Sequence, residues 1–174
     1  DDKSLRLGAD WIDDVSGASN TALLRAVANH PQARYVLMHS LSIPAAPHKT
    51  LPQDIHPVEA VLAFAKDKIA FCESQGIARE NILFDVGIGF GKTAEQSLIL
   101  LQQCETFHCL NVPLYIGHSR KSFLSPYGDK PANQRDTETL TCSLALAQKG
   151  VRYLRVHNVA LHHHNFNLWD DLNV

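Results

Sequence analysis

The sequence predicts an α/β fold in which parallel strands alternate with helices. Apolar runs of about five residues recur along the chain, and between them lie longer stretches whose apolar residues are spaced three and four positions apart. The expected strands are residues 9–13, 35–39, 82–86, 113–117 and 153–157. The expected helices lie near residues 19–29, 56–76, 94–105, 133–149 and 159–172.

The boundaries of these elements follow from local patterns. The stretch 56–76 places apolar residues on one helical face, at Val58, Val61, Leu62, Ala65 and Ile69. Gly76 and Gly150 each precede a β-branched residue and suit the C-termini of helices that are followed by a strand. Residues 1–7 have the pattern of the end of a helix that precedes the first strand.

Length and composition indicate one globular domain, or part of one, that binds a small molecule. The chain has 174 residues, of which 45% are hydrophobic and 20% charged, enough for a sizeable core. A net charge of −2 without a basic tract argues against a nucleic-acid partner. No apolar run is long enough for a membrane span, and residues 1–3 do not begin a signal peptide. We therefore expect no membrane partner and a cytoplasmic location.

The cysteines and a histidine triplet raise the question of metal binding. The four cysteines have neither CxxC spacing nor histidines at zinc-site intervals, so we expect reduced thiols at Cys72, Cys104, Cys109 and Cys142. The triplet His162, His163 and His164 lies inside the last helical pattern and is followed by further apolar residues. A mostly exposed helix face is the favoured interpretation of this triplet.

Polar residues follow the predicted strands, each of which ends at or beside Asp, His or Gly. Sheets and barrels of this class place their active sites at the carboxyl ends of the strands, where the loops converge. Residues 85–93, DVGIGFGKT, come directly after the third strand and resemble a phosphate-binding loop. They fail that test, because a P-loop needs Gly at position 86 and a dinucleotide fingerprint needs Gly at position 92. What remains is a carboxylate followed by a glycine-dense turn that can approach a ligand closely.

Two further segments bring cations to strand ends. Residues 117–123, GHSRKSF, follow the fourth strand with two adjacent cations and two hydroxyls, which suit an anionic or carbonyl-rich substrate. In the fifth strand, Arg155 and His157 alternate to the same face. Taken alone, residues 117–123 could form a solvated basic turn. His157, taken alone, would more simply have a structural role.

Taken in order, these motifs resemble the second half of dihydropteroate synthase. The resemblance rests on DDVSG at 13–17, Met38-His39, DVGIGFGKT at 85–93, GHSRKSF at 117–123 and RVHNV at 155–159. It implies an eight-stranded βα barrel in which residues 1–174 supply strands four to eight of the pterin-binding domain. The first three βα units of that barrel would then lie outside this sequence.

The resemblance also implies a reaction and a set of site residues. Dihydropteroate synthases join 6-hydroxymethyl-7,8-dihydropterin diphosphate to p-aminobenzoate and release diphosphate. By this resemblance Asp13, Asp85 and Lys121 would bind the pterin, and Phe90, Ser119 and Arg120 would line the p-aminobenzoate side and the exit. Arg155 and His157 would bind the diphosphate, and the catalytic residues would be Lys121, Arg155 and His157. Mg²⁺ would assist, held by a ligand in the missing N-terminal part, and a homodimer is expected.

This chain departs from the family pattern at two positions of the site. Asp13 stands where the family usually has Asn, and Asn158 stands where an Asp is frequent. These departures keep open a catalytically silent pterin-binding paralogue or structural partner. A folate-dependent methyltransferase is a third reading, although the residues Ser119, Arg120 and Lys121 would not be expected there. Competition by sulfonamides would separate the three.

Overall fold

The computed structural model describes residues 2–44, 46 and 49–172. Its strands are β1 (Trp11–Asp14), β2 (Arg34–Met38), β3 (Ile82–Asp85), β4 (Tyr115–Ile116) and β5 (Tyr153–Leu154). β1 pairs in parallel with β2, β2 with β3, and β4 with β5. A parallel bridge between Phe84 and Leu114 joins β3 to β4. Neighbours in sequence are therefore neighbours in space, which is the strand order of a (βα)8 barrel.

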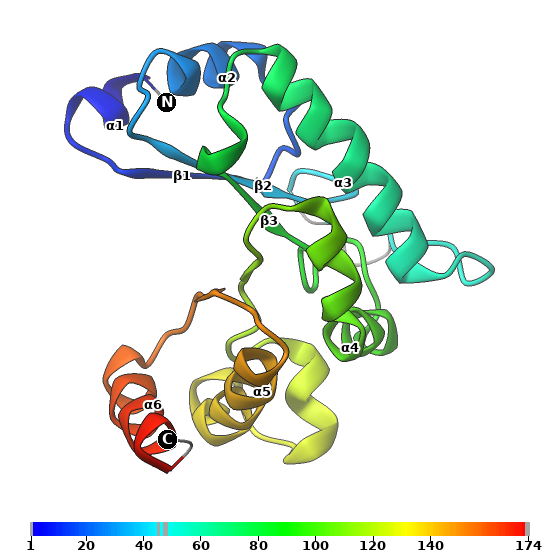
Figure 1. Cartoon of the computed structure of the whole chain (residues 1–174). Coiled ribbons are helices and arrows are strands. Elements are labelled where there is room, and N and C mark those ends of the chain that lie inside the picture. The colour runs from blue at the N-terminus through cyan, green and yellow to red at the C-terminus, as the bar shows by residue number, and fades with distance from the viewer. Residues whose placement is uncertain (1, 45, 47–48, 173–174) are drawn as a thin grey trace.

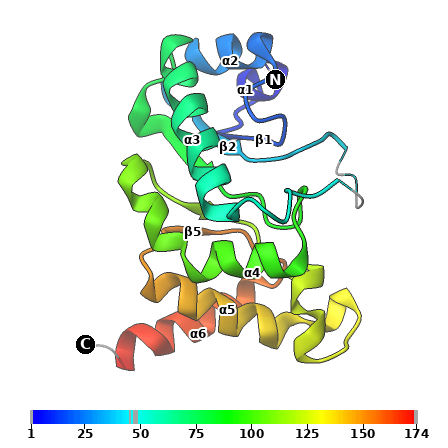
Figure 2. The same ribbon diagram turned by 90° about the vertical axis from the view of Figure 1, so that its right-hand side faces the viewer.

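Helices connect the strands and cover one side of them. They are α1 (Asp2–Arg6), α2 (Thr21–Ala28), α3 (Pro57–Ser74), α4 (Ala94–Gln102), α5 (Asp136–Gln148) and α6 (Val159–Leu172). Short 3-10 helices lie at Arg79–Asn81, Cys104–Leu110, Ser122–Tyr127 and Ala132–Gln134. Figure 1 shows α1 to α3 beside the first strands, and Figure 2 shows α3, α4, α5 and α6 following one another along the molecule. The chain thus has the architecture of part of a TIM barrel.

The ends of the helices are set by local chemistry. Asn20 caps α2 by accepting the backbone N–H of Leu23 at 3.1 Å. Thr93 and Gln96 form a reciprocal capping box at the start of α4. Gly76 and Gly150 follow α3 and α5 with φ of 92° and 78°, conformations that favour glycine. The predicted role of both glycines at helix C-termini is confirmed.

The sheet has two faces with different contents. Alternate strand residues face the helices and form the main core with them, among them Tyr35, Leu37, Ile82, Phe84, Leu114 and Ile116. The intervening positions point to the opposite, inner face and include Trp11, Asp13, Val36, Met38, Leu83 and Asp85. Val36, Met38 and Leu83 are buried there. The two carboxylates of the inner face, Asp13 and Asp85, lie near the carboxyl ends of β1 and β3.

The two outermost strands meet at the inner face through three side chains. The ring of Trp11 on β1 lies 5.1 Å from the ring of Tyr153 on β5. Arg34 on β2 donates from Nη1 to the hydroxyl of Tyr153 at 2.7 Å and lies 5.3 Å above the Trp11 ring. Side chains from β1, β2 and β5 therefore meet across the curved inner face, although β1 and β5 do not pair with each other.

Most of the predicted elements are confirmed, with shorter strands at the end of the chain. β4 and β5 contain only two residues each, although Arg155 continues the ladder by donating its N–H to Ile116 at 3.0 Å. The four cysteines are free thiols. His163 and His164 are exposed as predicted, but His162 is buried, with Nε2 2.9 Å from the hydroxyl of Ser143 on α5. The prediction of a mostly exposed helix face is therefore confirmed, with His162 as the buried member of the triplet.

Candidate active site

The first part of the site is a buried carboxylate held by a glycine turn. Asp85 ends β3, is 2% exposed, and accepts the N–H of Gly87 at 2.7 Å. Gly87 has φ of 69°, and a Cβ added there would lie 1.9 Å from the carbonyl oxygen of His39. Only glycine fits this position. Burial raises the pKa of Asp85, and the Gly87 N–H and Lys121 oppose that shift.

A buried lysine closes the same turn from behind. The ammonium of Lys92 donates to the carbonyls of Gly87 at 2.9 Å and Phe90 at 3.0 Å. It also contacts Nδ1 of His39 at 2.8 Å. The hydrogen-bonding capacity of the Lys92 side chain is therefore taken up by the turn and by His39, the residue after β2, and not by a phosphate-binding loop.

The second part of the site is a cavity of about 280 Å³ where cations gather. It is lined by Gly117, Ser119, Lys121, Arg155, Val156 and His157. Ser119 accepts the backbone N–H of His157 at 3.2 Å, and its hydroxyl lies 2.9 Å from Nδ1 of the same residue. The predicted alternation of Arg155 and His157 therefore brings both side chains to one cavity, together with the segment after β4.

Lys121 links the cavity to the carboxylate. Its ammonium lies 4.8 Å from the centre of the Phe90 ring and donates to the carbonyl of Ile88 in the glycine turn. Burial lowers the pKa of Lys121 to about 8, while the nearby charge of Asp85 opposes the shift. At neutral pH the amine is therefore mostly protonated and lies between the cavity and a buried carboxylate.

The two adjacent aspartates at the end of β1 have separate surroundings. Asp13 lies on the inner face, with Oδ2 3.5 Å from Nη1 of Arg155. Burial raises the pKa of Asp13, and Arg155 opposes the shift. Asp14 points into the opposite side and accepts from the Tyr35 hydroxyl at 2.5 Å and from the N–H groups of Ser16 and Ala18. Asp13 is thus available to the site, and Asp14 holds the loop.

Arg120 is turned away from the cavity lining. Its guanidinium makes a bidentate contact with Asp136 at the start of α5, with Nε–Oδ1 of 2.7 Å and Nη2–Oδ2 of 2.9 Å. Asn158 donates to the same carboxylate at 3.0 Å. Seven of the eight predicted site residues therefore lie at the turn, the cavity or the adjoining inner face, and Arg120 lies behind them.

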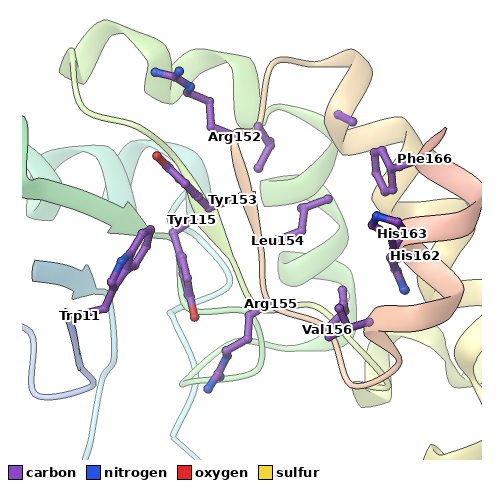
Figure 3. Close-up of a pocket in the computed structure, with 13 residues that line it drawn as sticks. Trp11, Tyr115, Arg152, Tyr153, Leu154, Arg155, Val156, His162, His163 and Phe166 are labelled. Carbon is purple, nitrogen blue, oxygen red and sulfur yellow. The ribbon is translucent and has the colours of Figure 1, made fainter. Parts of the chain in front are cut away.

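A larger, open cavity of about 580 Å³ lies along β5. Figure 3 shows Trp11, Tyr115 and Arg155 on one side of this strand, and Val156, His162, His163 and Phe166 toward α6 on the other. Arg155 lines both this cavity and the smaller one. The inner face of the sheet is therefore accessible from the side of β5.

A family profile described as "Pterin binding enzyme" matches residues 2–157. The chain belongs to the pterin-binding enzyme family. The folate synthesis bifunctional protein of Chlamydia caviae is 39% identical over 149 residues, which are 86% of this chain and 33% of that protein. Dihydropteroate synthase of Escherichia coli strain K12 is 33% identical over 157 residues, 90% of this chain and 55% of that protein. This chain therefore spans about a third to a half of the length of these relatives.

Solved structures of family members agree with this assignment. Dihydropteroate synthase from Thermus thermophilus in complex with 6HMPPP matches with a TM-score of 0.90 and 30% identity, over 99% of this chain and 68% of that chain. The enzyme from Xanthomonas albilineans in complex with 7,8-dihydropteroate matches with a TM-score of 0.87 and 31% identity, over 98% of this chain and 62% of that chain. The predicted barrel architecture and the predicted family are confirmed.

In this member of the pterin-binding enzyme family, the supporting residues of the site were not identified from the sequence. His39 and Lys92 lay inside the motifs but had no role, and Asp136 was not considered. The sequence did hold a signal for Lys92. Because the glycine turn before it lacks P-loop spacing, this lysine needs to contact a group other than a phosphate. Nothing local marks Asp136, whose partner Arg120 lies 16 positions earlier in the sequence.

Metal and membrane features are limited in the part of the chain that the structure describes. Over residues 2–44, 46 and 49–172, no group of three or more His, Cys, Asp or Glu is arranged to hold a metal ion. The cation cavity itself is lined by Lys121, Arg155 and His157, which do not suit Mg²⁺. No helix in the described ranges is both long and apolar enough to cross a membrane.

Proposed function

We propose that this chain carries the C-terminal part of a dihydropteroate synthase. The supporting observation is the placement of Lys121 between the buried Asp85 and the cavity that Arg155 and His157 line. One end of such a site suits the N–H groups of a pterin ring, and the other suits a diphosphate. The similar enzymes from Thermus thermophilus and Xanthomonas albilineans, solved with 6HMPPP and with 7,8-dihydropteroate, support this assignment.

In this proposal the pterin is held by two carboxylates and one ammonium. Asp85 accepts from the N–H groups of the amino-pyrimidine edge, and its fixed hydrogen bond from Gly87 sets its orientation. Asp13 offers a second acceptor at the inner face, while Lys121 donates to the pterin carbonyl. Because Asp85 is buried with a raised pKa, donors from the ligand favour its ionised form.

The reaction is a substitution at the methylene carbon of the pterin. The bond from that carbon to the diphosphate oxygen breaks, the nitrogen of p-aminobenzoate forms the new bond, and the amine loses a proton. The departing diphosphate gains negative charge as the bond breaks. Arg155 and His157 stabilise that charge, and Ser119 orients His157. Holding the amine in line with the reacting carbon supplies the rest of the acceleration.

A complete site requires residues that precede this segment. We include in the proposal that three N-terminal βα units complete the barrel and supply the Mg²⁺ ligand, which would help neutralise the diphosphate. In support, the curated relatives are two to three times longer than the matched region, as shares of 33% and 55% indicate. Among the described residues β1 pairs only with β2 and β5 only with β4. We call residues 1–174 together with these units the complete barrel.

A homodimer and a cytoplasmic location also belong to the proposal. An apolar groove of about 440 Å³ between α4, Ser122–Tyr127 and α5, lined by Leu98, Leu101, Phe123 and Leu146 among others, supports a dimer through the late helices. The four free cysteines support a reducing compartment. p-Aminobenzoate and the dihydropterin diphosphate are the small-molecule partners.

The experiment that tests the function is a turnover assay of the complete barrel with both substrates, with and without a sulfonamide. A synthase forms dihydropteroate and diphosphate in equal amounts, and the sulfonamide competes with p-aminobenzoate. Pterin binding without turnover would instead identify the silent paralogue. Methyl transfer from methyltetrahydrofolate, without inhibition by the sulfonamide, would identify the methyltransferase.

A further inference from the structure

Three side chains tie the loops after β4 and β5 to each other behind the cation cavity. Arg120 belongs to the loop after β4, Asp136 begins α5, and Asn158 immediately precedes α6. The carboxylate of Asp136 accepts two hydrogen bonds from the guanidinium of Arg120 and one, at 3.0 Å, from Nδ2 of Asn158. One carboxylate therefore joins three segments of the chain.

The amide of Asn158 is used at both ends. Its Oδ1 accepts the N–H of Leu161 at 3.1 Å and so caps α6, while its Nδ2 donates to Asp136. A backbone N–H only donates and an ionised carboxylate only accepts, so these two partners fix the orientation of the amide. An aspartate at position 158 would keep the cap but would face Asp136 with a second negative charge.

The loop after β4 depends on such support. Arg120 has φ of 59°, which is uncommon for a residue with a side chain. Its N–H donates to the hydroxyl of Thr139 at 3.0 Å, and Arg135 donates to the carbonyls of Arg120 at 3.2 Å and Lys121 at 3.3 Å. Every one of these contacts comes from α5 or from the residue before it, the same element that carries Asp136.

Electrostatics supports the same arrangement. The hydrogen bonds from Arg120 lower the pKa of Asp136 to about 2, and the hydrogen bond from Asn158 acts in the same sense. Asp136 is therefore ionised across the working range of pH. With a neutral amide at position 158, the charge of the Asp136 carboxylate is balanced by Arg120, and Lys121 and Arg155 supply the cationic side chains of the cavity.

We propose that Arg120, Asp136 and Asn158 form a clamp that positions the cation cavity, with Asn158 as a positioning residue for binding of the diphosphate group. The choice of diphosphate as the anion rests on the proposed function, whereas the clamp itself rests on the contacts above. In this account Arg120 acts through Asp136 and does not touch the substrates. The geometry of Ser119 and Lys121 on one loop and of His157 on the other follows from the clamp.

The test compares Asn158→Asp with Asn158→Ser in the complete barrel. Both variants keep an oxygen that can cap α6, but the first adds repulsion against Asp136, whereas the second only shortens the side chain and so withdraws the donor from Asp136. Isothermal titration with inorganic diphosphate should show an affinity at least tenfold lower for Asn158→Asp and a smaller loss for Asn158→Ser. Asn165→Asp, which adds the same charge on α6 outside the cavity lining, should bind diphosphate like the wild type.

Two further readouts separate positioning from general damage. Affinity for 6-hydroxymethylpterin, which uses the Asp85 end, should stay within about twofold of wild type in Asn158→Asp. Adding Asp136→Asn to Asn158→Asp should raise diphosphate affinity, although Asp136→Asn alone lowers it. Equal diphosphate affinity for Asn158→Asp and wild type, or a parallel loss of pterin affinity, would overturn the clamp.

Hydrogen exchange of backbone amides tests the clamp without relying on diphosphate binding. The backbone N–H groups of residues 119–121 and 157–161 should exchange at least tenfold faster in Asn158→Asp than in Asn158→Ser. A wild-type protein that binds no diphosphate would refute the proposed function, and this exchange difference would still support the clamp. Equal exchange in the two variants would overturn it.

Discussion

The ammonium of Lys92 lies 2.8 Å from Nδ1 of His39 in the buried space behind the glycine turn. Burial lowers the pKa of Lys92 to about 7, and burial together with the ammonium lowers the pKa of His39 to about 3. The imidazole is therefore neutral and accepts from the lysine. The Lys92–His39 pair holds the main chain of residues 87–90 in place. That main chain in turn sets the positions of the Asp85 carboxylate and of the Phe90 ring beside Lys121.

Replacing Lys92 with Met should destabilise the protein. The change leaves the buried carbonyls of Gly87 and Phe90 and the His39 nitrogen without their donor, at about 1–3 kcal/mol for each unsatisfied group, partly offset because an amine is no longer buried. We expect the free energy of unfolding in urea to fall by about 2–4 kcal/mol in the complete barrel. Lys66→Met, at an exposed position of α3, is the matched control. A loss below about 0.5 kcal/mol would contradict this role.

Buried neutral histidines should make the fold sensitive to acid. Burial lowers the pKa of His118 to about 4, from an ordinary value of 6.5. Between these values the unfolded chain binds a proton that the folded protein does not, so stability falls as the pH decreases from 6.5 to about 4. In His118→Gln the slope of unfolding free energy against pH should be shallower by up to about 1.4 kcal/mol per pH unit. Equal slopes for this variant, the wild type and the exposed control His164→Gln would refute the prediction.

Asp85→Asn should weaken pterin binding with little change in stability. The amide oxygen can still accept the N–H of Gly87, but the amide nitrogen replaces an acceptor with a donor on the ligand side. We expect at least tenfold weaker binding of 6-hydroxymethylpterin by titration calorimetry, with a melting temperature within a few degrees of wild type. Asp54→Asn, at an exposed loop position, serves as the control. Unchanged pterin affinity would count against Asp85 as the anchor.

The order of strands and helices could be predicted because each element has its own periodicity, as the apolar face of α3 and the run at β3 illustrate. The cavity residues Ser119, Lys121, Arg155 and His157 could be predicted because they follow strands that end at the same edge. The residues that support the site through side-chain contacts could not be predicted. The contacts of Arg120 with Asp136 and of Lys92 with His39 join distant parts of the sequence. The burial of His162 within a mostly exposed helix face was not predicted either, because its partner Ser143 lies on another helix.

Residues 1–174 alone should not form an active enzyme. Trp11 is 38% exposed on β1, and the open cavity along β5 exposes further apolar side chains. Among the described residues, β1 and β5 each also have one unpaired edge, and unpaired strand edges promote association between chains. We expect aggregation or weak solubility of the isolated segment by size-exclusion chromatography with light scattering. Mixing it with the N-terminal portion should restore monodispersity and turnover. A monodisperse isolated segment with full synthase turnover would show that the site is already complete.

The most direct test of the account is the turnover of Lys121→Ala in the complete barrel. Loss of one electrostatic contact at a reacting centre costs about a hundredfold or more in rate, so kcat for dihydropteroate formation should fall by at least about that factor. Because the pKa of Lys121 is about 8, wild-type kcat/KM should also decline as the pH rises through that value, and this decline should be absent from the variant. Lys149→Ala, on the outer surface beside Glu105, should keep wild-type kinetics. A Lys121→Ala variant within threefold of wild-type turnover would contradict the assignment of Lys121 to the reacting centre.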